Sequence, residues 1–210
     1  MSIPEDEKDF YKYTKDHRFA VMYPLLAREV VSKYDIVEGV CLDIGTGSAA
    51  LSIELSKITD LEIIALDAEP EAIELARENC VMHGVPDGRI RFVSAPVEKM
   101  PLPDGSADLI LSRGSIPFWE NHVSAFEEIQ RVLAPGGKAM IGCGFSRLQT
   151  LEEVKGMRPV WAPDVLEERT RWKKGSFLTD TLGQASVKEY DIIDDSYGTW
   201  VEIRKSGGKG

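Results

Sequence analysis

The feature that most constrains the fold is the stretch 40–50, VCLDIGTGSAA, which indicates a buried strand, a glycine-rich turn and the start of a helix. Glycines allow a sharp turn that brings the backbone close to a ligand. The helix start directs free N–H groups to the same place. Asp67, at the end of the next apolar run, is placed to accept hydrogen bonds from ribose hydroxyls. This arrangement predicts a site for a nucleoside-containing cofactor.

The glycine pattern alone leaves the cofactor open. Gly45, Gly47 and Ala50 also fit the dinucleotide fingerprint, so an NAD site is one interpretation. Asp43, two positions before the first glycine, places a carboxylate at the end of the strand. A fixed anion there repels a pyrophosphate and attracts an ammonium group. S-adenosylmethionine carries an ammonium group and no phosphate, so Asp43 favours it over NAD.

Length, composition and charge bound the class of protein. A chain of 210 residues with 43% hydrophobic and 29% charged residues suits one globular domain with a full core. The net charge of −10 argues against a nucleic-acid surface. We expect the densest basic cluster to be a solvated helix face; it consists of Arg169, Arg171, Lys173 and Lys174.

Several absences in the sequence set further expectations. No apolar run approaches the roughly 20 residues of a membrane span, and the acidic segment 2–7 lacks a signal-peptide core. The three cysteines, Cys41, Cys80 and Cys143, have neither an even count nor a metal-ligand spacing. We therefore expect a cytoplasmic, reduced protein with no metal.

Strand patterns alternate with helix patterns through residue 144. The strands are expected at 40–44, 62–67, 90–95, 107–112 and 138–144. The helices are expected at 24–31 and 48–57, from 70 to before 84, and from the N-cap Asn121 to a turn at 134–137. Such alternation predicts a parallel sheet with helices on both faces.

The last part of the chain departs from this alternation. Residues 145–185 are expected to be irregular, with short helical patterns at 151–155 and 163–174. Two strand patterns, 187–193 and 199–204, are joined by so short a segment that they must form an antiparallel hairpin. The predicted fold is therefore α/β and Rossmann-like, with a seven-stranded, mostly parallel sheet and a C-terminal antiparallel hairpin. It forms one domain over 1–205, followed by a disordered tail at 206–210.

Four segments together resemble the motifs of one family. They are 41–47 (CLDIGTG), 65–67 (ALD), 97–104 (VEKMPLPD) with 107–109 (ADL), and 131–138 (RVLAPGGK). In this order and spacing they resemble class I S-adenosylmethionine-dependent methyltransferases, of the small-molecule type similar to the ubiquinone/menaquinone-biosynthesis enzymes. The resemblance implies S-adenosylmethionine as cofactor, S-adenosylhomocysteine as product and methyl transfer by in-line displacement.

The resemblance also implies roles for single residues. Residues of the first motif would hold the methionine part of the cofactor, Asp67 its ribose hydroxyls, and Ala68 and Val97 its adenine. Ser112 and Arg113 would line the methyl-donor end. The implied cofactor-binding residues are Asp43, Gly45, Thr46, Gly47, Asp67, Ala68, Val97, Ser112 and Arg113. Two positions depart from the family pattern, since Ala49 replaces a motif glycine and Pro96 replaces an acid that often binds the adenine amine.

The sequence says less about the acceptor and the catalytic groups. Segment 112–119 lacks the N-P-P-Y motif of nucleobase- and glutamine-directed enzymes, which leaves a small-molecule acceptor selected by 145–185. Trp161, Trp172 and Phe177 in that region suggest an apolar or aromatic ligand. The oligomeric state cannot be predicted.

Catalytic residues are unassigned, and the candidates are Arg113, His122 and His17. His17 belongs to residues 1–35, which include a helix and are expected to cover the cofactor as a lid. Two other interpretations stay open. One is a non-catalytic S-adenosylmethionine-binding protein, because no clear general base is present. The other is an NAD(P)-dependent oxidoreductase, which Asp43 and the terminal hairpin disfavour.

Overall fold

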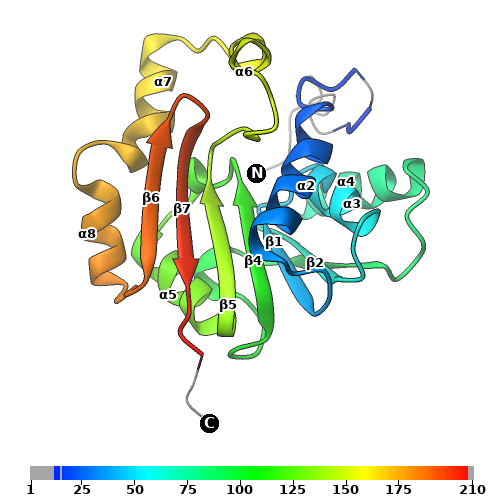
Figure 1. Cartoon of the computed structure of the whole chain (residues 1–210), viewed down its shortest axis with the longest axis horizontal. Coiled ribbons are helices and arrows are strands. Elements are labelled where there is room, and N and C mark those ends of the chain that lie inside the picture. The colour runs from blue at the N-terminus through cyan, green and yellow to red at the C-terminus, as the bar shows by residue number, and fades with distance from the viewer. Residues whose placement is uncertain (1–11, 15, 208–210) are drawn as a thin grey trace.

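The computed structural model describes residues 12–14 and 16–207, and their strands form one seven-stranded sheet in the order β3-β2-β1-β4-β5-β7-β6 (Figure 1). The strands are β1 (Val40–Ile44), β2 (Glu62–Asp67), β3 (Ile90–Ser94), β4 (Ala107–Arg113), β5 (Leu133–Gly142), β6 (Tyr190–Asp195) and β7 (Gly198–Arg204). Neighbouring strands are parallel from β3 to β5, and β7 pairs antiparallel with both β5 and β6. The predicted fold, hairpin included, is confirmed.

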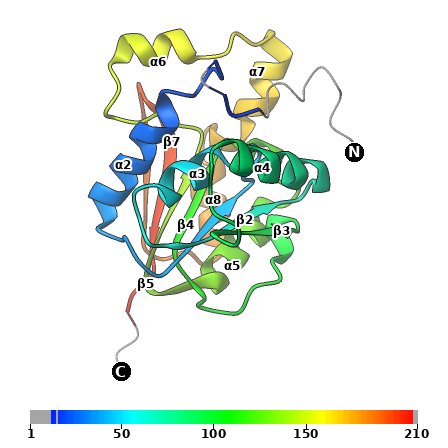
Figure 2. The same cartoon turned by 90° about the vertical axis from the view of Figure 1, so that its right-hand side faces the viewer.

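Helices cover both faces of this sheet (Figures 1 and 2). The α-helices are α2 (Met22–Tyr34), α3 (Ala50–Ser56), α4 (Pro70–Met82), α5 (His122–Val132), α6 (Leu151–Met157), α7 (Pro163–Thr170) and α8 (Phe177–Gln184). Three single 3-10 turns lie in the connections: η1 (Val97–Lys99) between β3 and β4, η2 (Ile116–Phe118) between β4 and α5, and η3 (Arg171–Lys173) between α7 and α8. Among the described residues, no helix has the length and apolar character that crossing a bilayer requires.

The two cores follow from the alternation of side chains along each strand. On β1, Cys41 faces a core shared with α2, α3 and α4, whereas Leu42 faces a core shared with α5 and α8. The same alternation places Ile63 of β2 on the first face and Ile64 on the second. Because both faces are buried, the central strands are mostly apolar, with exceptions such as Asp43 of β1 and Asp108 of β4 near the strand ends.

The end of α5 and the start of β5 differ from the sequence prediction. Asn121 caps α5 as expected, accepting a hydrogen bond from the Ser124 N–H at 3.1 Å. The predicted turn at 134–137 is instead a bulge inside β5. Ala107 pairs with Leu133 and Leu109 with Lys138, so β4 has only one residue, Asp108, opposite the four residues 134–137.

Residues 145–185 are more regular than predicted. They form α6, α7, η3 and α8, and the sequence analysis missed α8 altogether. Leu178 and Leu182 of α8 are buried against α5, a tertiary contact that local patterns do not report. Figure 1 shows α6 beyond the ends of β4 and β5, at the carboxyl edge of the parallel strands, and α7 at the same edge beside β6. Of the expected disordered tail, residues 208–210 lie outside the described residues.

Candidate functional site

The glycine turn after β1 is fixed to the end of β2. The N–H groups of Gly45 and Thr46 both donate to the Leu66 carbonyl, at 2.8 and 3.0 Å. Gly45 and Gly47 have φ values of +65° and +52°, which side-chain-bearing residues rarely adopt. A Cβ on Gly45 would overlap the side chain of Ser115. Glycine is therefore required at the first position for both backbone and steric reasons.

Asp43 lies buried under this turn, with 3% of its surface exposed. Its Oδ2 accepts hydrogen bonds from the hydroxyls of Thr46, at 2.8 Å, and Ser52, at 2.7 Å. Burial raises the pKa of Asp43, and the two hydroxyls oppose the rise. The predicted carboxylate at the end of β1 is thus part of a polar network beneath the turn.

Asp67 connects the turn to the following helix. Its Oδ2 accepts from the Gly47 N–H at 2.9 Å, and its Oδ1 accepts from the Glu69 N–H at 3.1 Å. Burial raises the pKa of Asp67, and these N–H groups oppose the rise. A carboxylate has about four lone-pair positions, so two hydroxyls can still bind. Ala68 follows directly, between β2 and α4.

The third position of the glycine pattern is strained. Ala49, which replaces the usual glycine, has φ +55° and is the N-cap residue of α3. Left-handed backbone costs a residue with a Cβ about 1–2 kcal/mol. The methyl group of Ala49 is fully buried, and burial of one such group returns roughly 0.8 kcal/mol. Burial of the methyl group therefore offsets part of the backbone strain that Ala49 introduces at this position.

Val97 is a buried residue three positions after the end of β3. It begins η1, is 5% exposed and packs in the core shared with α5. The next residue, Glu98, holds η1 against the start of α5, because its Oε1 accepts from the N–H groups of Glu120 and Asn121 at 2.9 and 3.2 Å. Pro96, where an acid is common, is the extended residue before the turn.

The loop after β4 contains a residue that the sequence analysis did not select. Ser115 Oγ lies 2.6 Å from Ser112 Oγ, accepts from the Trp119 indole N–H at 3.1 Å, and lies 3.3 Å from the Ile44 carbonyl. It therefore joins the ends of β4 and β1 and fills the space that Gly45 leaves open. Its position in a Gly-Ser turn directly after a buried strand was the available signal.

Arg113 braces the segment before α2. Its guanidinium carbon lies 4.2 Å from the ring centroid of Phe19, 5.7 Å from that of Tyr23 and 5.6 Å from that of Phe145. Its Nε donates to the Gly144 carbonyl at 3.4 Å. These cation–π contacts hold the N-terminal segment to the ends of β4 and β5.

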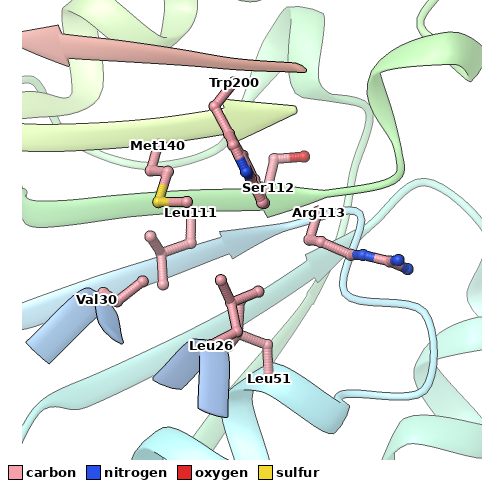
Figure 3. A pocket seen from close by; sticks show the side chains of 8 residues that line it. All are labelled: Leu26, Val30, Leu51, Leu111, Ser112, Arg113, Met140 and Trp200. Carbon is pink, nitrogen blue, oxygen red and sulfur yellow. The ribbon is translucent and has the colours of Figure 1, made fainter. Parts of the chain in front are cut away.

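A narrow cavity, too small to hold a water molecule, lies next to Arg113, between α2, α3 and the sheet (Figure 3). In Figure 3, the Arg113 side chain extends away from the apolar side chains of the cavity. The lining residues are Leu26, Val30, Leu51, Leu111, Ser112, Arg113, Met140 and Trp200. Because six of these residues are apolar or aromatic, the cavity belongs to the core beneath the site.

The two histidine candidates hold backbone groups. His122 Nε2 lies 2.9 Å from the Ile116 carbonyl, and its ring lies edge-on to Phe177. Burial lowers the pKa of His122, so the ring is neutral at pH 7 and Nε2 carries the proton. His17 Nδ1 accepts from the Phe19 N–H at 3.2 Å.

The three catalytic candidates do not form one group. The ring of His17 packs against Phe19, with 5.8 Å between centroids, and Phe19 in turn contacts Arg113. His122 instead lies at the start of α5, next to Trp119. The structure therefore connects His17 with Arg113 through Phe19 and places His122 in a separate cluster.

Tyr13 anchors the segment before α2 to α3 and α4. Its hydroxyl donates to Glu54 at 2.9 Å, and its N–H donates to Asn79 at 3.1 Å. The Asn79 amide donates in turn to the Ser48 carbonyl of the glycine turn at 2.9 Å. The ring of His83 stacks on Tyr13 with 4.8 Å between centroids. Hydrogen bonds thus connect the N-terminal segment to the glycine turn.

Comparison with known proteins decides the family. The sequence model of the methyltransferase domain family matches residues 42–158, more than half of the chain, and this range contains the glycine turn, Asp67 and Arg113. The chain belongs to this family. S-adenosylmethionine is its cofactor, and the described residues fit it. The fit rests on a glycine turn that a Cβ would block and on a buried carboxylate at the end of β2.

Relatives of this methyltransferase-family protein include enzymes with different acceptors. It is 26% identical over 164 residues to sterol 4-C-methyltransferase of Caenorhabditis elegans, covering 66% of this chain and 48% of that protein. It is 34% identical over 105 residues to the ubiquinone/menaquinone biosynthesis C-methyltransferase UbiE of a Geobacter species, covering 49% and 44%. The chain thus spans about half the length of these curated relatives.

Similarity to one solved structure extends over the whole chain. A protein of Methanococcus maripaludis, assigned as an S-adenosyl-L-methionine-dependent methyltransferase, is 32% identical. The match covers 100% of this chain and 99% of that one, with a TM-score of 0.81. Membership of the family therefore extends to the N-terminal segment and the terminal hairpin, which lie outside residues 42–158.

Proposed function

We propose that this protein transfers a methyl group from S-adenosylmethionine to a small-molecule acceptor by in-line displacement. The observation that carries the proposal is the pairing of Asp67 with the Gly47 N–H, which sets a buried carboxylate beside a glycine turn. Asp43 beneath the turn adds a second carboxyl group, and among the described residues its side chain accepts hydrogen bonds from the hydroxyls of Thr46 and Ser52. An ammonium-bearing nucleoside suits this charge better than a dinucleotide does.

The residues that would hold the cofactor follow the strand ends in order. The turn and Asp43 would bind the methionine part, Asp67 the ribose hydroxyls, and Ala68 with Val97 the adenine. Ser112 and Arg113 would border the methyl-donor end. The full proposed set is Asp43, Gly45, Thr46, Gly47, Asp67, Ala68, Val97, Ser112 and Arg113. These residues lie at or just after the ends of β1, β2, β3 and β4.

The protein's own contribution is alignment and exclusion of water. When bound, S-adenosylmethionine supplies an activated methyl group, so positioning provides most of the acceleration. The segment 12–21, held by Tyr13 and by Arg113, would cover the site as a lid. We leave the general base unassigned, because His122 and His17 each hold a backbone group.

The acceptor would bind against residues 145–185. Sterol 4-C-methyltransferase and UbiE, the relatives named above, support a small-molecule acceptor. In this chain α6 lies beyond the carboxyl ends of β4 and β5, and α7 lies at the same edge of the sheet beside β6 (Figure 1). A cytoplasmic location is also part of the proposal, supported by three cysteines that are all unpaired.

Calorimetry followed by an activity screen tests the proposal. We expect S-adenosylhomocysteine to bind the full chain and NADH not to bind. A screen with S-adenosylmethionine labelled in the methyl group should then show transfer to at least one acceptor among phenols, quinols and carboxylic acids. Binding without turnover on any acceptor would favour a non-catalytic S-adenosylmethionine-binding protein. Binding of NADH alone would favour the oxidoreductase.

A further inference from the structure

Arg169 of α7 is a half-buried cation without an acidic partner among the described residues. Its guanidinium carbon lies 4.6 Å from the ring centroid of Phe118 and 4.5 Å from that of Trp161. No ion pair or hydrogen bond from this guanidinium occurs in the part of the chain that the structure describes. Stacking on rings uses the faces of the guanidinium and leaves its N–H groups, which lie in its plane, available as donors.

Two further cations lie at the same edge of the sheet. Arg113 ends β4 and also has no acidic partner among the described residues. Lys173 of η3 donates to Thr199 at 3.1 Å and lies 3.6 Å from Asp194. The Thr199 carbonyl accepts from the N–H of Cys143, the residue after β5, at 3.0 Å. The hydrogen bonds thus place Lys173 at the ends of β5 and β7.

Cys143 indicates that the three cations share one region. Burial raises the pKa of its thiol to about 11, and Arg113, Lys173 and Arg169 all act on it in the opposite direction. The packing of η2 against both α7 and η3 supports the same conclusion, because Arg169 lies in α7, Lys173 in η3 and Arg113 just before η2.

The two rings that contact Arg169 are partly exposed, and further exposed apolar side chains lie near them in the sequence. Phe118 is 63% exposed, Trp161 40% and Val160 98%, and Leu166 of α7 is also exposed. Phe118 lies in η2, just after β4, whereas Val160 and Trp161 lie just before α7 and Leu166 lies within it. Apolar side chains beside an unpaired guanidinium suit a ligand with an apolar body and an anionic group.

We propose that the methyl acceptor is an amphipathic anion, and that Arg169 binds its oxyanion group, a carboxylate or a phosphate. Phe118 and Trp161 would hold the guanidinium in place and contact the apolar body. Lys173 and Arg113 would add positive potential without being its direct partners. This inference rests on the proposed function, because it names the substrate class of the same site.

Matched naphthalene probes test the proposal on the full chain saturated with S-adenosylhomocysteine. Calorimetry compares 2-naphthoate, 2-naphthyl phosphate and the neutral 2-naphthalenemethanol, with inorganic phosphate as an anion that lacks the ring. We expect at least one aromatic anion to bind tenfold or more tightly than the neutral alcohol and than phosphate alone. The tighter of the two anions identifies carboxylate or phosphate as the preferred group.

Three variants assign the preference to Arg169. Arg169→Gln should remove most of it, and Arg169→Lys should restore part of it by returning the charge. Lys174→Gln removes one charge from an exposed lysine nearby, which pairs with Glu167, and should retain the preference. Circular dichroism and S-adenosylhomocysteine affinity should be unchanged in all three, which separates recognition from folding.

Several outcomes would overturn the proposal. They are equal binding of anion and alcohol, no binding of any naphthalene probe, an unchanged preference in Arg169→Gln, or an equal loss in Lys174→Gln. The proposed function fails separately, if the unmodified protein does not bind S-adenosylhomocysteine in the first titration.

Discussion

At the scale of single residues, Asp67 combines a structural and a binding role. It already accepts hydrogen bonds from the N–H groups of Gly47 and Glu69. We expect Asp67→Ala to weaken S-adenosylhomocysteine binding at least tenfold, because two charge-assisted hydrogen bonds to the ribose and the anchor of the turn are lost together. Calorimetry measures the change.

Two further variants make the Asp67 prediction specific. Asp67→Asn keeps one acceptor oxygen and should lose less affinity than Asp67→Ala. Asp60→Ala removes an exposed carboxylate just before β2 and should leave the affinity within about twofold. If Asp67→Ala binds S-adenosylhomocysteine as well as the unmodified protein, Asp67 does not hold the ribose.

Asp43 gives a prediction about pH. Burial raises its pKa above the ordinary 3.8, so the folded state holds the proton more tightly than the unfolded state does. This group's contribution to stability is therefore full below pH 3.8 and is lost as the pH rises through the raised pKa. Asp43→Asn has no such loss, and its amide oxygen can still accept from the Thr46 and Ser52 hydroxyls.

The difference in unfolding free energy between Asp43→Asn and the unmodified protein should thus move in favour of the variant as the pH rises from about 4 to about 7. Urea unfolding at a series of pH values measures it, with Asp60→Asn as the exposed control. A difference that stays constant with pH would show that burial does not shift the titration of Asp43.

The positions of some residues in the candidate site could be predicted from the sequence, and those of others could not. Asp43, Gly45 and Asp67 were predicted, because a strand-turn-helix pattern places strand-end carboxylates with little freedom. Ser115 was not predicted, since its importance comes from facing Gly45 across the ends of β1 and β4. The contacts of Arg113 with Phe19 and Phe145 join segments far apart in the chain, which local patterns cannot specify.

At the scale of elements, the turn between β1 and α3 should tolerate no side chain at Gly45. Gly84 offers a matched comparison, because its φ of +67° is nearly that of Gly45, at +65°, but a Cβ there would meet nothing within 4 Å. Gly84→Ala should cost only the left-handed strain, about 1–2 kcal/mol. Gly45→Ala should cost roughly 1–3 kcal/mol more, from overlap with Ser115.

Urea unfolding of both variants measures the two costs, and Gly45→Ala should also lose S-adenosylhomocysteine binding. In the double variant Gly45→Ala with Ser115→Gly, the destabilisation from steric overlap should disappear, whereas the destabilisation from left-handed backbone strain should remain. Equal costs for Gly45→Ala and Gly84→Ala would mean that the loop after β4 moves freely away from the turn.

Elements defined by local sequence patterns were predictable, whereas elements that depend on tertiary contacts were not. The strands β1 and β2 match their predicted ranges, because each is a short apolar run closed by polar residues. The extent of β5 was wrong, since the bulge at 134–137 depends on pairing with β4. The helix α8 was missed because Leu178 and Leu182 acquire their role only against α5.

At the scale of the whole molecule, the segment before α2 connects both halves of the site. Tyr13 fixes it to α3, and Phe19 fixes it to Arg113 at the end of β4. Figure 2 shows this segment beneath α6, at the same edge of the molecule as the insertion. The lid expected over 1–35 extends in part to residues 1–11, which lie outside the described residues. What can be tested is whether 12–21 controls access to the cofactor.

Tyr13→Phe tests this control with the loss of one hydroxyl. The hydrogen bond to the Glu54 carboxylate stabilises the closed segment by about 1–2 kcal/mol, so its loss should make opening roughly five- to thirtyfold more frequent. If the segment must open before the cofactor leaves, the dissociation of S-adenosylhomocysteine should accelerate by a similar factor. Stopped-flow displacement measures that rate, and amide hydrogen exchange over 12–21 measures the opening.

Tyr190→Phe is the matched control, because it removes the same group from β6, at the far edge of the sheet, and should change neither rate. The exchange rate and the dissociation rate together distinguish a lid, which must open before the cofactor leaves, from a segment that is only attached to the site. Faster exchange with faster dissociation means that the cofactor leaves through the opened segment. Faster exchange with unchanged dissociation would contradict the lid, because the cofactor would then leave by a path that Tyr13 does not close.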